Sequence, residues 1–341
     1  MSTYRLALLG FGNVGQALAR LLQRKRRQLI KDYGIGYTIT GIATARRGMA
    51  VRPEGLDIEQ ALQVVGTGGK LDELSSQPAP SDPLEFIRTC NADVLFENTP
   101  VNYIDGQPAV SFLQAALEAG MHAITANKGP VVHAYPQLTA LAAQHGRRFF
   151  FESAVMDGAP IFSLFRGSLP AVELLSFTGI LNSTTNLIFT RMEAGESFSE
   201  AVAYAQSIGI TETDPSGDID GWDAAVKVSA LVTVLMGIPL KPAQVERTGI
   251  RSLTSEHIRQ ASAEGKRWKL VCEAKRQGQQ VTARVSPQLV GPDSPLYGVN
   301  GTSSIVSFET DVLPQLSIVE GNPGPETTAY GLLADFINAT R

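Results

Sequence analysis

The feature that constrains the fold most is a glycine-rich turn between an apolar segment and a helical pattern. Residues 4–9 form a short apolar run typical of a buried strand, and residues 17–22 carry apolar side chains at helical spacing. Three glycines in such a turn permit a tight bend, a close backbone approach to a pyrophosphate and close packing of helix on strand. We therefore predict a dinucleotide site rather than a purely structural turn, formed by Gly10, Phe11, Gly12, Asn13, Val14 and Gly15.

The next predicted strand, residues 37–43, indicates which coenzyme fits. In a doubly wound sheet the end of this strand lies beside the adenosine ribose, where an acidic residue would bind the 2′-hydroxyl of NAD. The sequence has Arg46 and Arg47 instead, and guanidinium groups suit a 2′-phosphate. The pair favours NADP, although NAD stays possible and the alternative is two exposed loop arginines.

Two further predicted strands end in polar clusters, at the edge where such a sheet binds its ligand. The clusters follow residues 93–97 and 122–125 and comprise Asn98, Thr99, Pro100 and Lys128. Both strand ends should face the nicotinamide half of the coenzyme. Lys128 is a candidate for ligand contact, and the alternative is a solvated loop lysine.

The pattern of strands and helices changes after residue 148. A chain of 341 residues has room for two domains of ordinary size. The predicted fold class is α/β, with a Rossmann-like doubly wound sheet in residues 1–148 and a second α+β domain with a mixed sheet in residues 149–310. Strands of the second domain are expected at residues 148–151, 172–177, 269–274, 281–285 and 304–308. Residues 46–83 indicate a loop-rich insertion without an assigned function.

Residues 212–227 combine five carboxylates with one lysine around a turn that leads into a helix. Asp220 is the predicted N-cap, with Asp223 three residues later in a capping-box-like start. Asp223 and Lys227 then share one helix face at i,i+4 spacing, and Glu212 and Asp218 reach the same space if the preceding loop folds back. The alternative is a solvated ion pair that contributes only about 0.3–0.5 kcal/mol.

Composition excludes several other functions. A net charge of −4 and a pI near 5.7 argue against nucleic-acid and anionic-membrane partners, which need a concentrated positive surface. Two cysteines support neither a disulfide framework nor a metal cluster, and they fit a reducing compartment such as the cytoplasm. No apolar run approaches the roughly 18 residues of a membrane helix, so no membrane association is expected.

Several of these segments together resemble homoserine dehydrogenases. The resemblance rests on the glycine turn, on Thr125 to Gly129, on Gly179 to Asn186, on the acidic segment and on Gly321 to Thr328, in that family's order. It implies a short form without a fused kinase or a C-terminal regulatory domain. It also implies that residues 311–341 return to complete the nucleotide-binding domain, with Gly324, Glu326 and Thr328 beside the coenzyme.

The family reduces aspartate 4-semialdehyde to homoserine with NAD(P)H, in threonine, methionine and isoleucine biosynthesis. By resemblance, Lys227 and Lys128 are candidates for proton transfer or carbonyl polarisation, and Asp223 holds Lys227. Glu212 and Asp218 would bind the substrate ammonium. The substrate pocket would also include Asn182, Ser183 and Thr184.

The resemblance further implies a monovalent cation, commonly sodium, and a homodimer formed through the sheet of the second domain. The cation would be held largely by backbone carbonyls of Glu152, Val155, Asp157 and Ala159. Met156, Asp157 and Ser183 stand where the family usually has small residues. These departures leave open a related dehydrogenase of another amino- or hydroxy-acid semialdehyde. A remote alternative from another class is a nucleotide-binding regulator without catalysis, against which the presence of both Lys128 and Lys227 argues.

Overall fold

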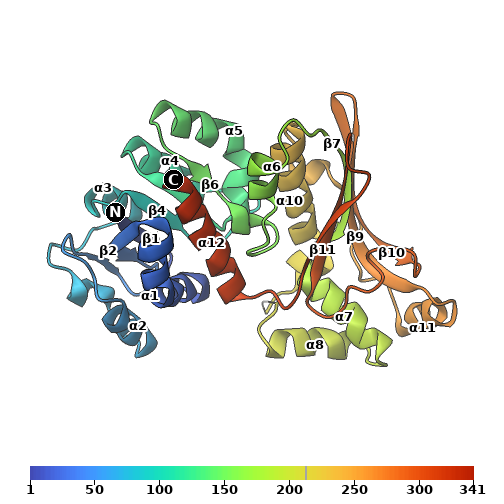
Figure 1. Ribbon diagram of the computed structural model, residues 1–341. Coiled ribbons are helices and arrows are strands. Elements are labelled where there is room, and N and C mark those ends of the chain that lie inside the picture. Colours follow the sequence, from blue (N-terminus) through green and yellow to red (C-terminus); the bar gives the residue numbers. More distant parts are fainter. Residues whose placement is uncertain (212) are drawn as a thin grey trace. The chain divides into compact units, whose positions relative to one another are not determined.

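The chain forms two compact units, each with its own sheet (Figure 1). The computed structural model describes every residue except Glu212. The first unit comprises Met1–Pro160 and Gly324–Arg341, and the second comprises Ile161–Pro323. None of the helices so described has the length and apolarity needed to cross a bilayer.

The first unit contains a six-stranded sheet in the order β3-β2-β1-β4-β5-β6. Its strands are β1 (Ser2–Leu9), β2 (Ile35–Ala43), β3 (Met49–Val51), β4 (Val94–Glu97), β5 (His122–Thr125) and β6 (Phe149–Phe150). All neighbours pair in parallel except β3, which is antiparallel to β2 at the sheet edge. The carboxyl ends of the parallel strands therefore meet at one edge of the sheet.

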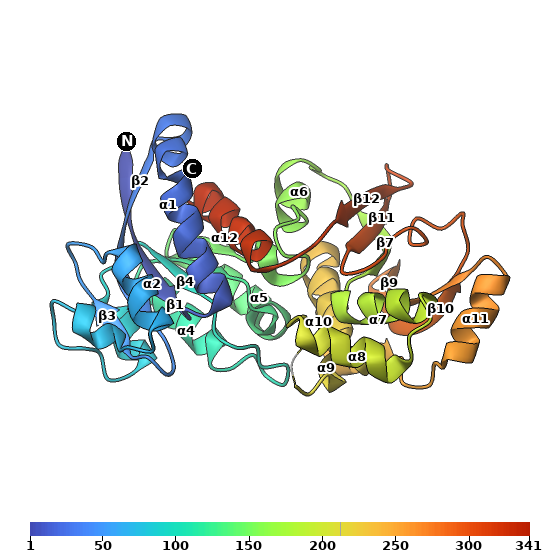
Figure 2. The same cartoon turned by 90° about the horizontal axis from the view of Figure 1, so that it is seen from below.

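Helices cover both faces of this sheet, because alternate side chains of each strand point to opposite faces. Leu6 and Leu8 of β1 belong to one core cluster with residues of α1 and α12, whereas Ala7 and Leu9 belong to another with residues of α3 and α4. The helix α12 lies against α1, although most of the chain separates them in sequence (Figure 2). The helices of this unit are α1 (Asn13–Tyr33), α2 (Ile58–Gly66), α3 (Pro83–Thr89), α4 (Ala109–Glu118), α5 (Lys128–Gln144) and α12 (Pro325–Ala339), with short 3-10 turns η1 (Leu71–Leu74) and η2 (Glu152–Ala154).

The second unit contains a mixed sheet in the order β12-β11-β7-β9-β10-β8. The strands are β7 (Leu174–Ile180), β8 (Glu246–Arg247), β9 (Arg267–Gln277), β10 (Gln280–Val290), β11 (Ser304–Thr310) and β12 (Leu316–Glu320). The helices are α6 (Phe162–Gly167), α7 (Ser183–Glu193), α8 (Phe198–Ser207), α9 (Ser216–Ile219), α10 (Trp222–Leu231) and α11 (Ser255–Ala263), with η3 (Val232–Met236) and η4 (Pro242–Gln244). Helices α7, α10 and α11 all pack on β9. The predicted fold class, a Rossmann-like unit followed by an α+β unit with a mixed sheet, is confirmed.

The unit boundaries differ from those expected at residues 148 and 310. Phe149 and Phe150 pair with β5 and so extend the first sheet, which moves the first boundary to Pro160. β12 pairs with β11 and so extends the second sheet, which moves the second boundary to Pro323. Residues 46–83, expected as a loop-rich insertion, contain three short elements, β3, α2 and η1, between their loops.

Candidate active site

The glycine turn of the first unit is shaped by contacts between backbone atoms. A Cβ built on Gly10, which has φ +97°, would lie 2.4 Å from the carbonyl oxygen of Asn98. A Cβ on Gly15 would lie 2.3 Å from the carbonyl oxygen of Gly10. By contrast, no described atom lies within 4 Å of a Cβ built on Gly12, which is the N-cap of α1. The turn thus leaves an open surface at a helix N-terminus, which suits a pyrophosphate.

The remaining residues of the turn surround this surface. Phe11 is buried in the core, Asn13 is exposed and Val14 is half-buried. Beside Gly10, both polar atoms of the Asn98 side chain are buried without a hydrogen-bond partner in the described part of the chain. Such buried polar atoms normally have partners, so a bound ligand at this sheet edge would satisfy them. The residues present therefore fit a dinucleotide.

The two arginines follow β2, as the sequence predicts, and lie in the turn between β2 and β3. The guanidinium of Arg47 donates to the carbonyl oxygen of Gly68. Arg46 is exposed, and its carbonyl oxygen accepts from Nζ of Lys70 at 3.0 Å. The arginine pair therefore lies at the carboxyl end of β2, and Arg47 already has a partner within the unit.

Thr99, Pro100 and Lys128 follow the carboxyl ends of β4 and β5. The side chain of Asn127 accepts a hydrogen bond from the amide of Gly129 at 3.0 Å and so caps α5, which begins at Lys128. The side-chain amide of Asn127 also donates to the carbonyl oxygen of Thr99 at 3.3 Å. The structure thereby joins the two polar clusters that the sequence placed at these strand ends.

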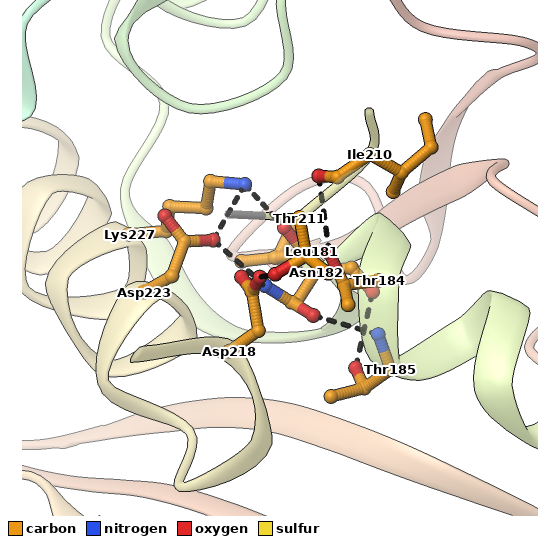
Figure 3. A network of polar contacts seen from close by, with 9 residues as sticks. All are labelled: Leu181, Asn182, Thr184, Thr185, Ile210, Thr211, Asp218, Asp223 and Lys227. Carbon is orange, nitrogen blue, oxygen red and sulfur yellow. Dashed lines mark hydrogen bonds and ion pairs between the residues drawn. The ribbon is translucent and has the colours of Figure 1, made fainter. Parts of the chain in front are cut away.

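In the second unit, Lys227 and Asp223 form the ion pair that their spacing predicts (Figure 3). Nζ of Lys227 lies 3.0 Å from Oδ2 of Asp223, and the two side chains are only 15% and 11% exposed. Nζ also donates to the carbonyl oxygen of Leu181 at 2.6 Å. The alternative of a solvated pair is therefore wrong. An ammonium has three donors, and within the described residues these two acceptors leave one N–H for a ligand.

Asn182 connects this pair to the second carboxylate of the acidic segment (Figure 3). Its side-chain nitrogen donates to Oδ1 of Asp218 at 2.6 Å and to Oδ2 of Asp223 at 3.0 Å. Its side-chain oxygen accepts from the amide of Thr185 at 2.8 Å and caps α7. One amide side chain thus holds both carboxylates and starts the helix.

Three residues that the sequence did not assign to the site complete this network. Thr211 donates to Oδ2 of Asp218 at 2.7 Å, Thr185 bonds to Asn182, and Leu181 contributes its carbonyl oxygen. Thr184, which was predicted, donates to the carbonyl oxygen of Ile210 at 3.5 Å. The acid-rich motif could have suggested Thr211 because it stands next to Glu212, but a backbone acceptor such as Leu181 has no sequence signal.

Other predictions for this segment have different outcomes. Asp220 is not the N-cap of α10: it ends α9 and pairs with Arg251 at 2.5 Å, while Gly221 with φ +78° precedes α10. The left-handed turn at Gly221 separates the two helices, so a continuous capping box cannot form. Ser183 begins α7 without a positive φ, so glycine is not required there. Glu212 lies outside the described residues.

The predicted cation loop belongs to the first unit and faces α12. Glu152 is 2% exposed, and Val155 and Ala159 are also buried. Asp157 has φ +37°, and its Oδ2 accepts from Oγ1 of Thr327 at 3.1 Å. The described part of the chain contains no group of three or more His, Cys, Asp or Glu side chains that could hold a metal ion. The oxygen-only donor set of the loop is of the type that hard cations prefer.

The predicted coenzyme contacts near the C-terminus lie at the start of α12. Gly324 is the N-cap and accepts from Oγ1 of Thr327 at 2.8 Å. The carbonyl oxygen of Thr328 accepts from Oγ of Ser153 at 2.7 Å. Glu326 is exposed and lies 3.7 Å from Arg24 of α1. These contacts fix the start of α12 beside α1, within the nucleotide-binding unit.

The doubly wound sheet with its glycine turn, together with an enclosed lysine–carboxylate pair in the second unit, defines a dinucleotide-binding oxidoreductase. Comparison with known proteins makes the class specific. Residues 10–152 match the family model described as homoserine dehydrogenase, NAD binding domain, and residues 160–337 match the model described as homoserine dehydrogenase. The chain belongs to the homoserine dehydrogenase family.

Several relatives match nearly the whole of this chain and nearly the whole of their own. An NAD(+)-dependent homoserine dehydrogenase of Pseudomonas canavaninivorans is 34% identical over 99% of this chain and 96% of its own. A homoserine dehydrogenase of Methanocaldococcus jannaschii is 35% identical over 98% of this chain and 97% of its own. A hyperthermophilic archaeal homoserine dehydrogenase, solved in complex with NADPH, has a TM-score of 0.84 and 28% identity over 99% of this chain and 98% of its own.

Proposed function

We propose that this protein interconverts L-homoserine and L-aspartate 4-semialdehyde by hydride transfer with NAD(P). The observation that carries the proposal is the enclosed ammonium of Lys227, bound by Asp223 and by the carbonyl oxygen of Leu181. Family membership gives the substrate. The open surface at Gly12 supports the coenzyme, as does the side-chain amide of Asn98 beside Gly10, which has no hydrogen-bond partner among the described residues.

The nicotinamide of the bound coenzyme supplies or accepts the hydride. When the semialdehyde carbonyl carbon gains that hydride, its oxygen becomes an alkoxide, which Lys227 stabilises and protonates. In the reverse direction the neutral amine of Lys227 removes the hydroxyl proton. Asp223 holds the amine in place, because its carboxylate is itself fixed by Asn182. Lys128 is the second candidate for polarising the carbonyl.

The substrate ammonium requires carboxylates nearby. Asp218 already accepts one hydrogen bond on each oxygen, from Asn182 and from Thr211, and each oxygen has a further lone pair. These two donors orient the carboxylate without neutralising it. Asp218 therefore remains suited to bind the substrate ammonium, and we propose Glu212 as the second such group.

A substrate comparison tests the reaction. The purified protein should reduce coenzyme in the presence of L-homoserine and much more slowly with L-serine or L-threonine, as followed by nicotinamide absorbance. Coenzyme binding without turnover of homoserine would contradict the proposal, and faster turnover of another hydroxy amino acid would indicate a changed substrate. Ser183→Gly then tests whether the serine at the start of α7 selects the substrate.

We further propose a preference for NADP. Arg46 and Arg47 support it because they follow β2 where a 2′-phosphate would lie, and the strand ends without a carboxylate. The relative from Pseudomonas canavaninivorans is named NAD(+)-dependent, so relatives alone give no preference. Arg46→Ala should raise KM for NADP more than KM for NAD. Equal effects on both coenzymes would contradict the preference.

We also propose a monovalent cation at the loop of Glu152 to Ala159, held mainly by carbonyl oxygens. The burial of Glu152, Val155 and Ala159, the turn at Asp157 and the preference of hard cations for oxygen ligands support it. Thermal unfolding followed at constant ionic strength should show a higher midpoint in sodium chloride than in choline chloride. An identical midpoint in both salts would argue against a bound cation.

A homodimer through the second sheet is the last part of the proposal. The sheet face opposite α7 and α10 carries a groove of about 670 Å³, lined by residues that include Thr178, Glu273, Lys275, Arg284, Ser307 and Glu309. Its mixed charges suit a second copy of the same face. Ser307→Arg should shift the mass measured by light scattering from dimer to monomer, whereas the exposed substitution Gln260→Arg on α11 should not.

A further inference from the structure

One buried carboxylate near the predicted coenzyme site has no role in the chemistry proposed above. Glu97, the last residue of β4, is 0% exposed. Its Oε1 accepts from the amide of Thr99 at 2.7 Å and from the Thr99 hydroxyl, and its Oε2 accepts from Oγ1 of Thr125 at 2.7 Å. Burial raises the pKa of Glu97, against the lowering effect of these uncharged donors. A buried carboxylate held only by neutral groups costs stability, which points to a role beyond packing.

A short chain of hydrogen bonds leads from this carboxylate to the start of α5. Oγ1 of Thr125 lies 2.7 Å from Oε2 of Glu97 and 3.0 Å from its backbone carbonyl oxygen, with the carboxylate the nearer acceptor for its one proton. The same oxygen accepts from the amide of Asn127 at 2.9 Å. Oδ1 of Asn127 then accepts from the amide of Gly129 at 3.0 Å. Lys128 stands between these two residues, so the residue before it bonds to Thr125 and the residue after it bonds to Asn127.

The turn between β5 and α5 also packs closely against a neighbouring loop. A Cβ built on Gly129 would lie 2.9 Å from Cα of Gly106 and 3.0 Å from the carbonyl oxygen of Asn102. The backbone of the turn therefore touches the loop that follows β4. The turn therefore has little space on this side, and on the other side it is hydrogen-bonded through Thr125 to Glu97.

We propose that Glu97 is a positioning residue, whose buried carboxylate joins the turns after β4 and β5 and thereby sets the position of Lys128. The catalytic role of Lys128 in this inference rests on the proposed function. The hydrogen bonds from Glu97 to the start of α5 do not depend on it. Glu97→Gln keeps the shape of the side chain and replaces one acceptor oxygen by a donor. Thr125→Val removes the link between Glu97 and Asn127, and Thr125→Ser retains it.

The first test needs no catalysis. Amide hydrogen exchange of the coenzyme-free protein should be at least about tenfold faster in residues 125–130 for Glu97→Gln and for Thr125→Val than for the wild type. Thr125→Ser should exchange like the wild type. Asp93→Asn is the matched control. Asp93 directly precedes β4, at the end of this strand opposite to Glu97, and pairs with Arg5 at 2.7 Å. It should leave residues 125–130 unchanged.

The second test is a double-mutant cycle with Lys128→Met. Glu97→Gln should lower kcat for homoserine about 10- to 100-fold, because small displacements of a reacting group cost that much. In the Lys128→Met background the same substitution should lower kcat less than about twofold, since the group it positions is absent. A purely structural role would instead give equal losses in both backgrounds.

The outcomes separate the two proposals. Unchanged exchange in residues 125–130, or additive losses in the cycle, would overturn the role of Glu97. A wild type that does not oxidise homoserine would overturn the proposed function, and the exchange measurement would still decide whether Glu97 holds this turn. If Glu97→Gln does not fold, the comparison of Thr125→Val with Thr125→Ser decides through the same two measurements.

Discussion

The glycines of the first turn are required for different physical reasons. Substituting each by alanine distinguishes these reasons. Gly15→Ala places a methyl group against the carbonyl oxygen of Gly10 and should lower the free energy of unfolding by about 1–3 kcal/mol. Gly12→Ala meets no described atom and should change it by less than about 1 kcal/mol. Its methyl group would instead occupy the open surface, so NADPH affinity, measured by fluorescence titration, should fall at least about tenfold. Binding like the wild type would contradict a pyrophosphate at this surface.

The ion pair of Asp223 and Lys227 differs from an exposed pair because both groups are enclosed. Asp223→Asn leaves a buried ammonium without its counter-charge and should lower the free energy of unfolding by about 3 kcal/mol. Lys266 and Glu264 form an exposed control pair at 2.9 Å, with side chains 45% and 59% exposed. Glu264→Gln should cost less than about 1 kcal/mol in the same urea titration. Equal costs for the two substitutions would show that enclosure of the pair has no energetic effect.

A second buried lysine makes stability depend on pH. Lys269 is fully buried and donates to Asn186 at 3.0 Å and to the carbonyl oxygen of Val299 at 2.5 Å. Burial lowers its pKa from 10.5 to about 8. Between these values the unfolded chain binds the proton and the folded chain does not, so stability rises as pH rises from 8 to 10.5 and is lost as pH falls.

The wild type should therefore gain about 3 kcal/mol of unfolding free energy over this pH range relative to Lys269→Met. Lys266→Met, at an exposed position, should follow the wild type at every pH. Urea titrations at several pH values measure the difference. A constant difference between the wild type and Lys269→Met would mean that the amine titrates alike in the folded and unfolded chains.

At the scale of elements, α12 is distant in sequence from the rest of the first unit but packs into its core. Phe336 is fully buried and packs edge-on against Tyr4 of β1 and Phe96 of β4, with ring centroids 5.9 and 6.1 Å apart. Phe336→Ala should lower the free energy of unfolding by about 3–5 kcal/mol because it leaves a cavity. Asn338→Ala, at an exposed position of the same helix, should change it by less than about 0.5 kcal/mol. Similar small effects at both positions would mean that α12 is not part of this core.

Elements with a long local pattern could be predicted from the sequence, and elements that depend on distant partners could not. β1, the glycine turn and α1 were predicted because the apolar run at residues 4–9, the three glycines and the helical spacing at residues 17–22 are all local signals. β3 has only three residues and was missed, because only its pairing with β2 identifies it. β6 lies within the strand expected at residues 148–151, but only its pairing with β5 shows that it belongs to the first sheet. The start of α10 was missed because the left-handed turn at Gly221 decides it, and helix-start signals favoured Asp220.

At the scale of the whole molecule, the two units have separate cores, and the sequence indicated both through the change of pattern after residue 148. The pair Asp223–Lys227 could be predicted because i,i+4 spacing is a local rule. Asn182 and Leu181 contact that pair, and Thr211 contacts Asp218, across long separations in sequence or between different elements, which no local rule describes. The role of Glu97 was not predicted for a related reason, since one partner, Thr125, lies on the neighbouring strand β5.

Homoserine-dependent coenzyme reduction by the wild type and by Lys227→Met tests the proposed role of Lys227 most directly. The wild type should turn over, and Lys227→Met should lose about 100- to 10,000-fold in kcat, as expected for loss of a general acid or base. NADPH affinity should stay within about twofold, because the glycine turn lies in the first unit. Lys266→Met should behave as the wild type. A Lys227→Met enzyme that keeps wild-type kcat would contradict the assignment of Lys227 as the proton-transfer group.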